Sequence, residues 1–200
     1  LTFKGGTSLS KAYQIIERFS EDVDLAIERD YLGFGADNDP EQGRSGKERQ
    51  RRIASLRSKC QTVIAEQMLP ALSEVIANHL RSSDWKLTLA DVDDDPDQQS
   101  IRFQFPPSLS GGLNAYFAPS VKLELGARSD HFPVESLPIR PYLADAFSRL
   151  LSQSDTTVRV LHVERTFWEK ATILHALAHR PLDKPLPKAQ SRHYYDLFQL

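Results

Sequence analysis

The segment from Asp22 to Ile27 most constrains the fold, because polar and apolar residues alternate strictly along it. Successive side chains of a β-strand point to opposite faces of a sheet. The alternation therefore predicts a strand that turns Val23 and Leu25 into a core and keeps Asp22 and Asp24 together on the other face. Two carboxylates spaced in this way lie about 7 Å apart along the strand.

A glycine-containing segment precedes this strand. Lys4-Gly5-Gly6-Thr7-Ser8 follows an apolar start and predicts a turn, after which apolar residues recur at helical spacing from Leu9 to Ile16. Thr7 or Ser8 is a suitable N-cap for that helix. Glycines let a ligand approach the backbone closely, and the positive end of a helix attracts a phosphate. If the glycines stood alone, an ordinary capped turn would explain them. Together with the carboxylates of Asp22 and Asp24, the glycine turn favours a phosphate site.

The rest of the chain alternates between helical and strand patterns, which predicts an α+β fold. A helical pattern covers about 47–80, with a break or kink at Pro70, and two short strands follow on either side of the aspartate-rich loop Asp91–Asp97. A further strand is predicted at 120–127, and helices at 163–179 and 191–200. A proline-rich connection through Pro133, Pro138 and Pro141 is expected to separate a lobe of residues 1–130 from a C-terminal helical lobe of residues 140–200.

The overall composition limits the class of protein. A chain of 200 residues with 40% hydrophobic content can bury one sizeable core and a small helical lobe. The net charge of -2 restricts any nucleic-acid contact to a local basic patch. Cys60 is the only cysteine, which excludes an intrachain disulfide and fits a reducing cytosol. No membrane-length apolar run or signal peptide is present, so a cytoplasmic protein is expected. Both ends fall within structural patterns, which indicates a fragment of a longer chain.

The paired aspartates suit a hard divalent cation. Magnesium prefers oxygen ligands and commonly binds one or two protein carboxylates together with substrate phosphates. Glu124 lies on the polar face of the strand at 120–127, so it supplies a third carboxylate if that strand lies beside Asp22 and Asp24. Three such acids would hold a metal ion and activate an acceptor hydroxyl. An isolated Asp-x-Asp pair is more often the solvated face of an edge strand.

Four segments resemble motifs of the AbiEii/AbiGii toxin family, which belongs to the DNA polymerase β-like nucleotidyltransferase superfamily. Phe3–Lys11 and Arg18–Leu25 resemble the first motif, Arg165–Lys170 resembles a helical motif with a functional lysine, and Arg192–Leu197 resembles the last motif. Residues 30–115 show no such motif. The resemblance implies a small mixed sheet of nucleotidyltransferase type with flanking helices.

The resemblance also assigns roles to individual residues. It implies that Asp22 and Asp24 bind Mg²⁺ or Mn²⁺, that Lys170 contacts a nucleoside triphosphate, and that Asp196 completes the site. Asp196 would orient Lys170, contact the nucleotide or serve the acceptor. Without the resemblance, both Lys170 and Asp196 would be expected on a helix surface. The phosphate-binding residues that it implies are Gly5, Gly6, Thr7 and Ser8.

The expected activity is therefore a metal-dependent transfer of a nucleotide from a nucleoside triphosphate to an RNA acceptor, for which the resemblance suggests tRNA. The resemblance implies the toxin of a bacterial toxin-antitoxin or phage-abortive-infection system, with a cognate antitoxin protein as partner. One alternative is a small-molecule nucleotidyltransferase of the antibiotic-modifying type, which would need an acidic pocket for a cationic substrate. Another is a non-catalytic nucleotide- or protein-binding module on the same fold.

Three other features have alternative interpretations. His175 and His179 have the i,i+4 spacing of a zinc pair but lack a surrounding zincin pattern, so they are expected to be ordinary helix histidines. The Asp91–Asp97 loop lacks the glycine and final glutamate of a calcium loop and is expected to be a solvated connection. A basic segment is either a solvated helix face or an RNA docking surface; it contains Arg44, Lys47, Arg49, Arg51, Arg52, Arg57 and Lys59.

Overall fold

The structure is a computed structural model that describes residues 1–20, 22–106, 119–129, 132–147, 149, 151, 155–181, 183–187 and 190–200. It divides into two compact units. The first unit consists of Leu1 and Glu21–Asp130, and the second of Thr2–Ser20 and His131–Leu200. Both units contain strands and helices, which confirms the predicted α+β class.

Four strands form the sheet of the first unit in the order β3-β4-β5-β2. They are β2 (Asp22–Ala26), β3 (Lys86–Leu89), β4 (Ser100–Gln104) and β5 (Ser120–Gly126). β2 pairs with β5 in parallel, whereas β3 with β4 and β4 with β5 are antiparallel. The predicted strands and hairpin are confirmed, and the pairing is mixed as expected.

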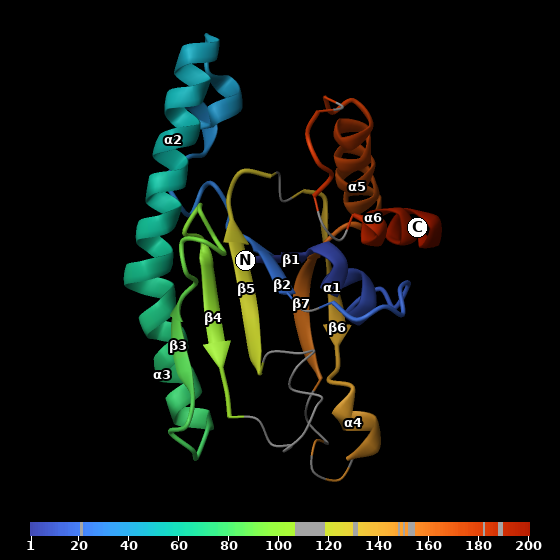
Figure 1. Cartoon of the computed structure of the whole chain (residues 1–200). Helices are drawn as coiled ribbons and strands as arrows, with labels where there is room; N and C mark the ends of the chain where they lie inside the picture. The colour runs from blue at the N-terminus through green and yellow to red at the C-terminus, as the bar shows by residue number, and fades with distance from the viewer. Residues whose placement is uncertain are drawn as a thin grey trace. The chain divides into compact units, whose positions relative to one another are not determined.

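A long helical segment accompanies these strands (Figure 1). It comprises α2 (Gly46–Val63), the π-helical turn η3 (Ile64–Met68) and α3 (Leu69–His79). The sequence predicted an interruption at Pro70, but the irregularity lies in the π-helical turn that precedes it. Pro70 occupies the first turn of α3, where a proline is tolerated because its missing N–H would have no helical partner.

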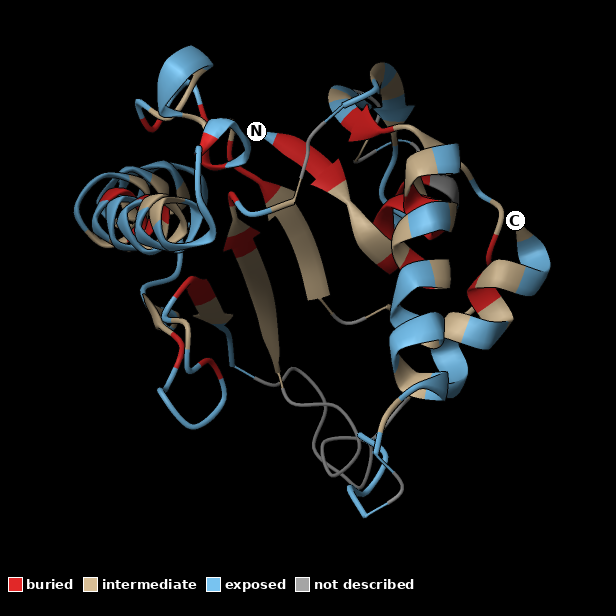
Figure 2. Cartoon of the chain, turned by 90° about the horizontal axis from the view of Figure 1, so that it is seen from above, coloured by how far each residue is buried: buried red, intermediate tan, exposed pale blue. Residues whose placement is uncertain are grey.

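The core of the first unit joins this helical segment to the sheet. Seen nearly end-on in Figure 2, α2 is exposed over most of its circumference, and only Leu56, Cys60 and Val63 of α2 are buried. Complete burial of a large aliphatic side chain contributes about 1.5–3 kcal/mol, so this narrow stripe fixes the helix against the strands. The buried cluster contains Ile27, Leu32, Leu56, Cys60, Val63, Ile64, Ile101, Leu125 and Ala127.

The segment after β2 contains two short 3-10 helices, η1 (Ala36–Asn38) and η2 (Pro40–Gln42). The buried Arg29 side chain holds this segment in place. It donates hydrogen bonds to the carbonyl oxygens of Ala127 and Arg128 and pairs with Asp39 at 3.0 Å. Arg52 also donates hydrogen bonds to the carbonyl oxygens of Asp37 and Asp39, so two arginines hold a segment that the sequence predicts only as a loop.

Three strands form the sheet of the second unit in the order β1-β7-β6. They are β1 (Thr2–Lys4), β6 (Val134–Ile139) and β7 (Thr156–Leu161), with β1 parallel and β6 antiparallel to β7. The proline-rich connection that was expected to separate two lobes contains β6, which includes Pro138, and the division between the two units falls just before it, at 130/131. Proline is accepted in β6 because this strand lies at the edge of its sheet.

The expected boundaries of the two lobes also differ from the observed units. The N-terminal segment Thr2–Ser20 groups with the residues after 131. One physical reason is the hydroxyl of Tyr13, which donates a 2.7 Å hydrogen bond to Glu135 on β6. The C-terminal part of the chain therefore combines strands with helices instead of forming a purely helical lobe.

The described helices of the second unit are α1 (Gly5–Lys11), α4 (Leu143–Ala146), α5 (Val163–Ala178) and α6 (Ser191–Gln199). Both predicted C-terminal helices are confirmed, but α1 starts earlier and ends sooner than predicted. Gly5 has a φ of +73° and begins the helix directly after β1, so the glycines lie in the first helical turn. None of the described helices combines the length and the apolar character needed to cross a membrane.

Candidate functional site

The register of β2 against β5 brings the predicted acidic residues of the first unit together. Asp24 lies opposite Glu124, and Asp22 lies opposite Lys122. Because residues opposite one another in a sheet project to the same face, Asp22, Asp24 and Glu124 share one face. All three are half-buried. The strand of Glu124 was required to lie beside β2, and it does. We call Asp22, Asp24 and Glu124 the carboxylate face.

Lys122 supplies a positive charge on this face. Its ammonium group lies 3.0 Å from Glu124 and 3.2 Å from Asp94. Partial burial acts to lower the pKa of Lys122, but the hydrogen bonds and charges of Glu124 and Asp94 outweigh it and raise the pKa above its ordinary value. The carboxylate of Glu124 is therefore paired with the ammonium group of Lys122.

Asp94 was not predicted as part of this network. The sequence indicated only a solvated loop at 91–97, whereas Asp94 pairs with both Lys122 and Arg102. Burial acts to raise its pKa, but these two cations lower it below the ordinary range. Asp95 is buried and accepts hydrogen bonds from the backbone N–H groups of Gln99 and Ser100. Alternating polarity gave no signal for these loop contacts.

The carboxylate face has the donor chemistry of a magnesium or manganese site. Its donors are carboxylate oxygens, and Mg²⁺ is commonly bound through only one or two carboxylates while phosphates and water complete its shell. Among the described residues, no three histidine, cysteine, aspartate or glutamate side chains form a ready-made metal cluster. The metal-binding role of Asp22, Asp24 and Glu124 stays a prediction, and Glu124 is already in contact with Lys122.

A second charged group lies in the second unit, where Asp196 on α6 is fully buried. Its carboxylate accepts two 2.7 Å hydrogen bonds from the guanidinium of Arg18 and lies 2.6 Å from the ammonium of Lys170 on α5. We call Arg18, Lys170 and Asp196 the Lys170 cluster. It contains two cations and one anion, so it carries a net positive charge.

Burial excludes one of the two sequence-based interpretations of Lys170, and its contact with a triphosphate stays a prediction. The residue is only 6% exposed, so it is not a surface lysine, and a buried charge requires a partner. Burial acts to raise the pKa of Asp196, but the hydrogen bonds from Arg18 and Lys170 outweigh it and lower the pKa. Asp196 therefore stays ionised and holds both cations in place. This arrangement corresponds to the first of its expected roles, the orientation of Lys170.

Helical periodicity over 163–179 predicts an apolar stripe of Phe167, Ala171, Leu174 and Ala178. The buried face of α5 is a different one and carries Lys170. The buried residues of this helix are Thr166 and Lys170, while Phe167 and Leu174 are only half-buried. The stripe prediction is therefore wrong about the most buried positions. The cause is the ion pair with Asp196, since a neutralised lysine can occupy a buried helix position that periodicity reserves for an apolar residue.

Gly6 has a packing role beside this cluster. A Cβ atom at Gly6 would lie 2.6 Å from Nη2 of Arg18 and 3.1 Å from Oγ of Ser20. The glycine thus leaves room for the arginine that holds Asp196. Arg18 was quoted in the resembling motif, but no role was predicted for it, because it lies in a loop without any periodic pattern.

The predicted phosphate-binding residues lie at the start of α1. No side chain caps this helix, and Gly6, Thr7 and Ser8 are buried. The prediction of Thr7 or Ser8 as the N-cap is wrong, because the N-cap position is Lys4 and both residues lie inside the helix. The hydroxyl of Ser8 donates a 2.9 Å hydrogen bond to the carbonyl oxygen of Gly5. The phosphate-binding role of this segment stays a prediction, as does the joint action of the carboxylate face and the Lys170 cluster.

Comparison with known proteins gives one match. The sequence profile described as "Nucleotidyl transferase AbiEii toxin, Type IV TA system" matches residues 1–200, the whole chain. The chain belongs to the AbiEii family. No curated protein and no solved structure gives a match. The resemblance carried by the glycine segment, the Asp-x-Asp strand and the Lys170 helix is thus confirmed at the level of the family, whose toxin-antitoxin description implies an antitoxin partner.

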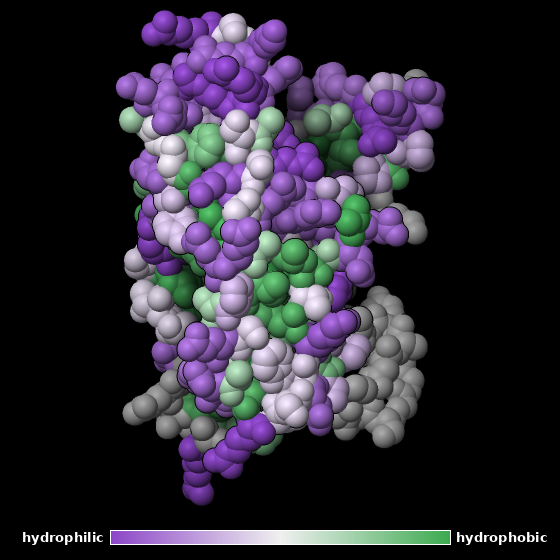
Figure 3. Space-filling model, turned by 90° about the vertical axis from the view of Figure 1, so that its left-hand side faces the viewer, coloured by the Kyte–Doolittle hydropathy of each residue, from purple (hydrophilic) through white to green (hydrophobic). Residues whose placement is uncertain are grey.

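The basic segment of this AbiEii chain is partly engaged in intramolecular contacts. Arg49 donates to the carbonyl oxygen of Gly43, Arg52 pairs with Glu48 and Arg57 pairs with Asp97. Its exposed basic residues are Arg44, Lys47, Arg49, Arg51 and Lys59. Hydrophilic side chains gather where α2 begins (Figure 3). The segment stays a candidate RNA docking surface as well as a solvated helix face.

The histidine pair of the AbiEii chain behaves as an ordinary helix pair. The rings of His175 and His179 lie with centroids 4.2 Å apart, and Nδ1 of His179 lies 2.9 Å from the carbonyl oxygen of His175. Both residues are exposed. In the described part of the chain no third ligand joins them.

Proposed function

We propose that this AbiEii chain transfers a nucleotidyl group from a nucleoside triphosphate to a hydroxyl group of RNA, with tRNA as the expected acceptor. The observation that carries the proposal is the register of β2 against β5, in which Asp24 lies opposite Glu124 on the face that also holds Asp22. The family match supports the reaction class. The acceptor is inferred from the exposed basic residues of α2 and from the expected activity of a toxin.

The proposed step balances as an in-line displacement. The acceptor oxygen forms a bond to the α-phosphorus, the bond from the α-phosphorus to the bridging oxygen breaks, and pyrophosphate leaves with the electron pair. The hydroxyl proton passes to a carboxylate of the carboxylate face. A divalent cation bound there would neutralise charge on the triphosphate and lower the pKa of the acceptor hydroxyl.

In this proposal the chain's own residues position the reactants. Asp22 and Asp24 hold the cation, and Lys122 limits the negative charge that Glu124 adds to the same face. Lys170, held by Asp196, provides a fixed ammonium group for the negative charge of the triphosphate. A cation that is already oriented pays no reorganisation cost when charge develops during the reaction.

The test is incubation of the purified chain with each radiolabelled nucleoside triphosphate, Mg²⁺ and total RNA. We expect label in RNA with the wild type and its loss with Asp24→Asn. The matched control is Asp93→Asn, because Asp93 is an exposed aspartate of the 91–97 loop in the same unit. This control is expected to retain full transfer.

Three outcomes would contradict the proposal. Equal labelling of RNA by Asp24→Asn and by the wild type would show that the carboxylate face takes no part in the reaction. Label found only in small molecules would favour a small-molecule nucleotidyltransferase. Absence of transfer to any acceptor, together with retained nucleotide binding, would favour a non-catalytic binding module.

A further inference from the structure

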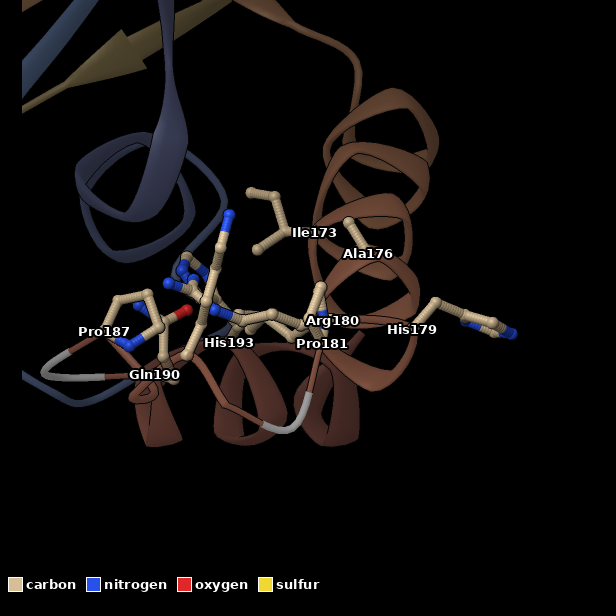
Figure 4. A pocket seen from close by; sticks show the side chains of 10 residues that line it. Ile173, Ala176, His179, Arg180, Pro181, Pro187, Gln190 and His193 are labelled. Atoms are coloured by element: carbon tan, nitrogen blue, oxygen red, sulfur yellow. The ribbon is translucent and has the colours of Figure 1, made fainter.

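A cavity of about 660 Å³ that opens widely to solvent lies on the surface of the second unit, between the C-terminal half of α5, the segment that follows it and the start of α6 (Figure 4). Its volume falls in the range of small-molecule sites, which is roughly 300–1,000 Å³. None of the residues assigned to the carboxylate face or the Lys170 cluster lines it. The reaction proposed above therefore gives this cavity no role.

The polar lining of the cavity is basic. Arg180, Lys184 and His193 contribute to the lining, and among the described lining residues there is no aspartate or glutamate. Burial acts to lower the pKa of His193, and the charges of Lys170 and Arg192 act in the same direction. Even a neutral imidazole keeps one N–H donor. The cavity thus offers donors and positive charge to an anion.

Two of these basic residues have a buried nitrogen without a partner. Nε of Arg180 and Nδ1 of His193 are buried, and the described part of the chain offers neither of them a hydrogen-bond partner. An unsatisfied buried polar group costs about 1–3 kcal/mol, so such groups are normally paired. Neither nitrogen is open to solvent, so an anion in the cavity would pair with them only after these side chains turn towards it.

The remaining wall of the cavity is apolar. Ile173, Leu177 and Pro187 line it, and Figure 4 shows Ile173 and Arg180 on the side of α5, with His193 and Pro187 across from them. An inorganic anion would leave this apolar surface uncovered. A ligand that fits the whole lining has a phosphate at one end and a flat, weakly polar body at the other.

We propose that this cavity binds a nucleoside phosphate, with the phosphate at Arg180 and Lys184 and the base against Ile173 and Leu177. The choice of a nucleoside phosphate rests on the proposed function, whereas the anion site rests on the cavity alone. The ligand has two possible sources, a free nucleotide or the terminal nucleotide of an RNA chain. Both present the same phosphate and base to the cavity.

The test is isothermal titration calorimetry of the whole chain with the four nucleoside 5′-monophosphates, a short single-stranded RNA and inorganic phosphate. Arg180→Gln is expected to weaken nucleotide binding about tenfold or more, the usual effect of losing a hydrogen bond to a charged group. Lys184→Gln is a second variant that preserves the fold, because Lys184 is exposed, and it should weaken binding in the same direction.

Two control variants separate this site from its surroundings. His179→Gln changes a residue at the rim whose ring points away from the other lining side chains (Figure 4), so it should leave binding unchanged. Asp24→Asn should abolish nucleotidyl transfer and leave this binding unchanged. The proposal about the cavity is therefore tested by nucleotide binding, and the proposal about the carboxylate face is tested separately by nucleotidyl transfer.

Tighter binding of the RNA than of any free nucleotide would assign the cavity to the acceptor, and the reverse would assign it to the free nucleotide; either result supports the proposal. Equal binding by wild type, Arg180→Gln and Lys184→Gln would overturn it. Inorganic phosphate binding as tightly as every nucleotide would also overturn it, because the apolar wall would then contribute nothing.

Discussion

Replacement of Asp196 by asparagine tests whether the Lys170 cluster is an element of stability as well as of the proposed site. The substitution keeps the size and shape of the side chain but removes its charge. Lys170 is only 6% exposed, so its ammonium group cannot recover full hydration. Arg18 has a side chain that is 22% exposed and can turn towards water.

The magnitude follows from the contacts that are lost. Asp196 receives two 2.7 Å hydrogen bonds from Arg18 and lies 2.6 Å from Lys170. Removing one partner of a buried ion pair typically costs about 3–5 kcal/mol, because the other charge stays buried without compensation. We expect Asp196→Asn to lower the free energy of unfolding of the second unit by about this amount.

The assay is urea denaturation followed by tryptophan fluorescence in a Trp85→Phe background. Trp85 belongs to the first unit and Trp168 to α5 of the second, so the remaining fluorescence reports the second unit. Asp155→Asn is the matched control, because Asp155 is exposed and lies 3.6 Å from Arg140 in an exposed pair. Such pairs contribute about 0–1 kcal/mol.

A rescue experiment separates the buried charge from simple loss of packing. If the uncompensated ammonium is the cause, Lys170→Met combined with Asp196→Asn should recover much of the lost stability. Loss of less than about 1 kcal/mol in Asp196→Asn, within the range of surface pairs, would refute the reasoning. Lack of any recovery in the double variant would show that the charge of Lys170 is not what makes the substitution costly.

The pKa of Asp196 gives this prediction a pH dependence. The folded state lowers this pKa below its ordinary value of 3.8, so the folded protein holds the carboxylate in its charged form more strongly than the unfolded chain does. The stabilisation is therefore fully present above the unfolded pKa and is lost as the pH falls through the lower folded value. The difference in stability between wild type and Asp196→Asn should shrink below about pH 4.

Three further predictions concern separate parts of the chain. Asp24→Asn should abolish Mn²⁺ binding measured by electron paramagnetic resonance, whereas Asp93→Asn should not; equal binding by both would exclude the carboxylate face as the metal site. Gly6→Ala should displace Arg18, which lies 2.6 Å from the added Cβ, and lower stability by about 1–3 kcal/mol; an unchanged melting temperature would contradict this. Burial raises the pKa of Cys60 to about 11, so this thiol should react with a disulfide reagent at pH 8 only after denaturation, and rapid reaction of the native protein would contradict its burial.

Local patterns were sufficient to predict many elements of this protein. Strict alternation predicted β2 and β5, and helical periodicity predicted α2, α5 and α6, because the period of the apolar residues differs between strands and helices. β6 was missed because its proline suppressed the strand signal. Glycine and hydroxyl residues in Lys4-Gly5-Gly6-Thr7-Ser8 suggested a separate turn, whereas the positive φ of Gly5 lets α1 begin immediately after β1.

The sequence by itself determined the α+β class, the sharing of one face by Asp22 and Asp24, and the family motifs, since all of these depend on neighbours along the chain. Only the tertiary structure decided that Glu124 lies opposite Asp24 and that Lys170 is buried beside Asp196. Strand register and the pairing of distant charges depend on contacts between residues far apart in the sequence. No local spacing of residues encodes them, because the energy that fixes them arises only when the separate elements pack together.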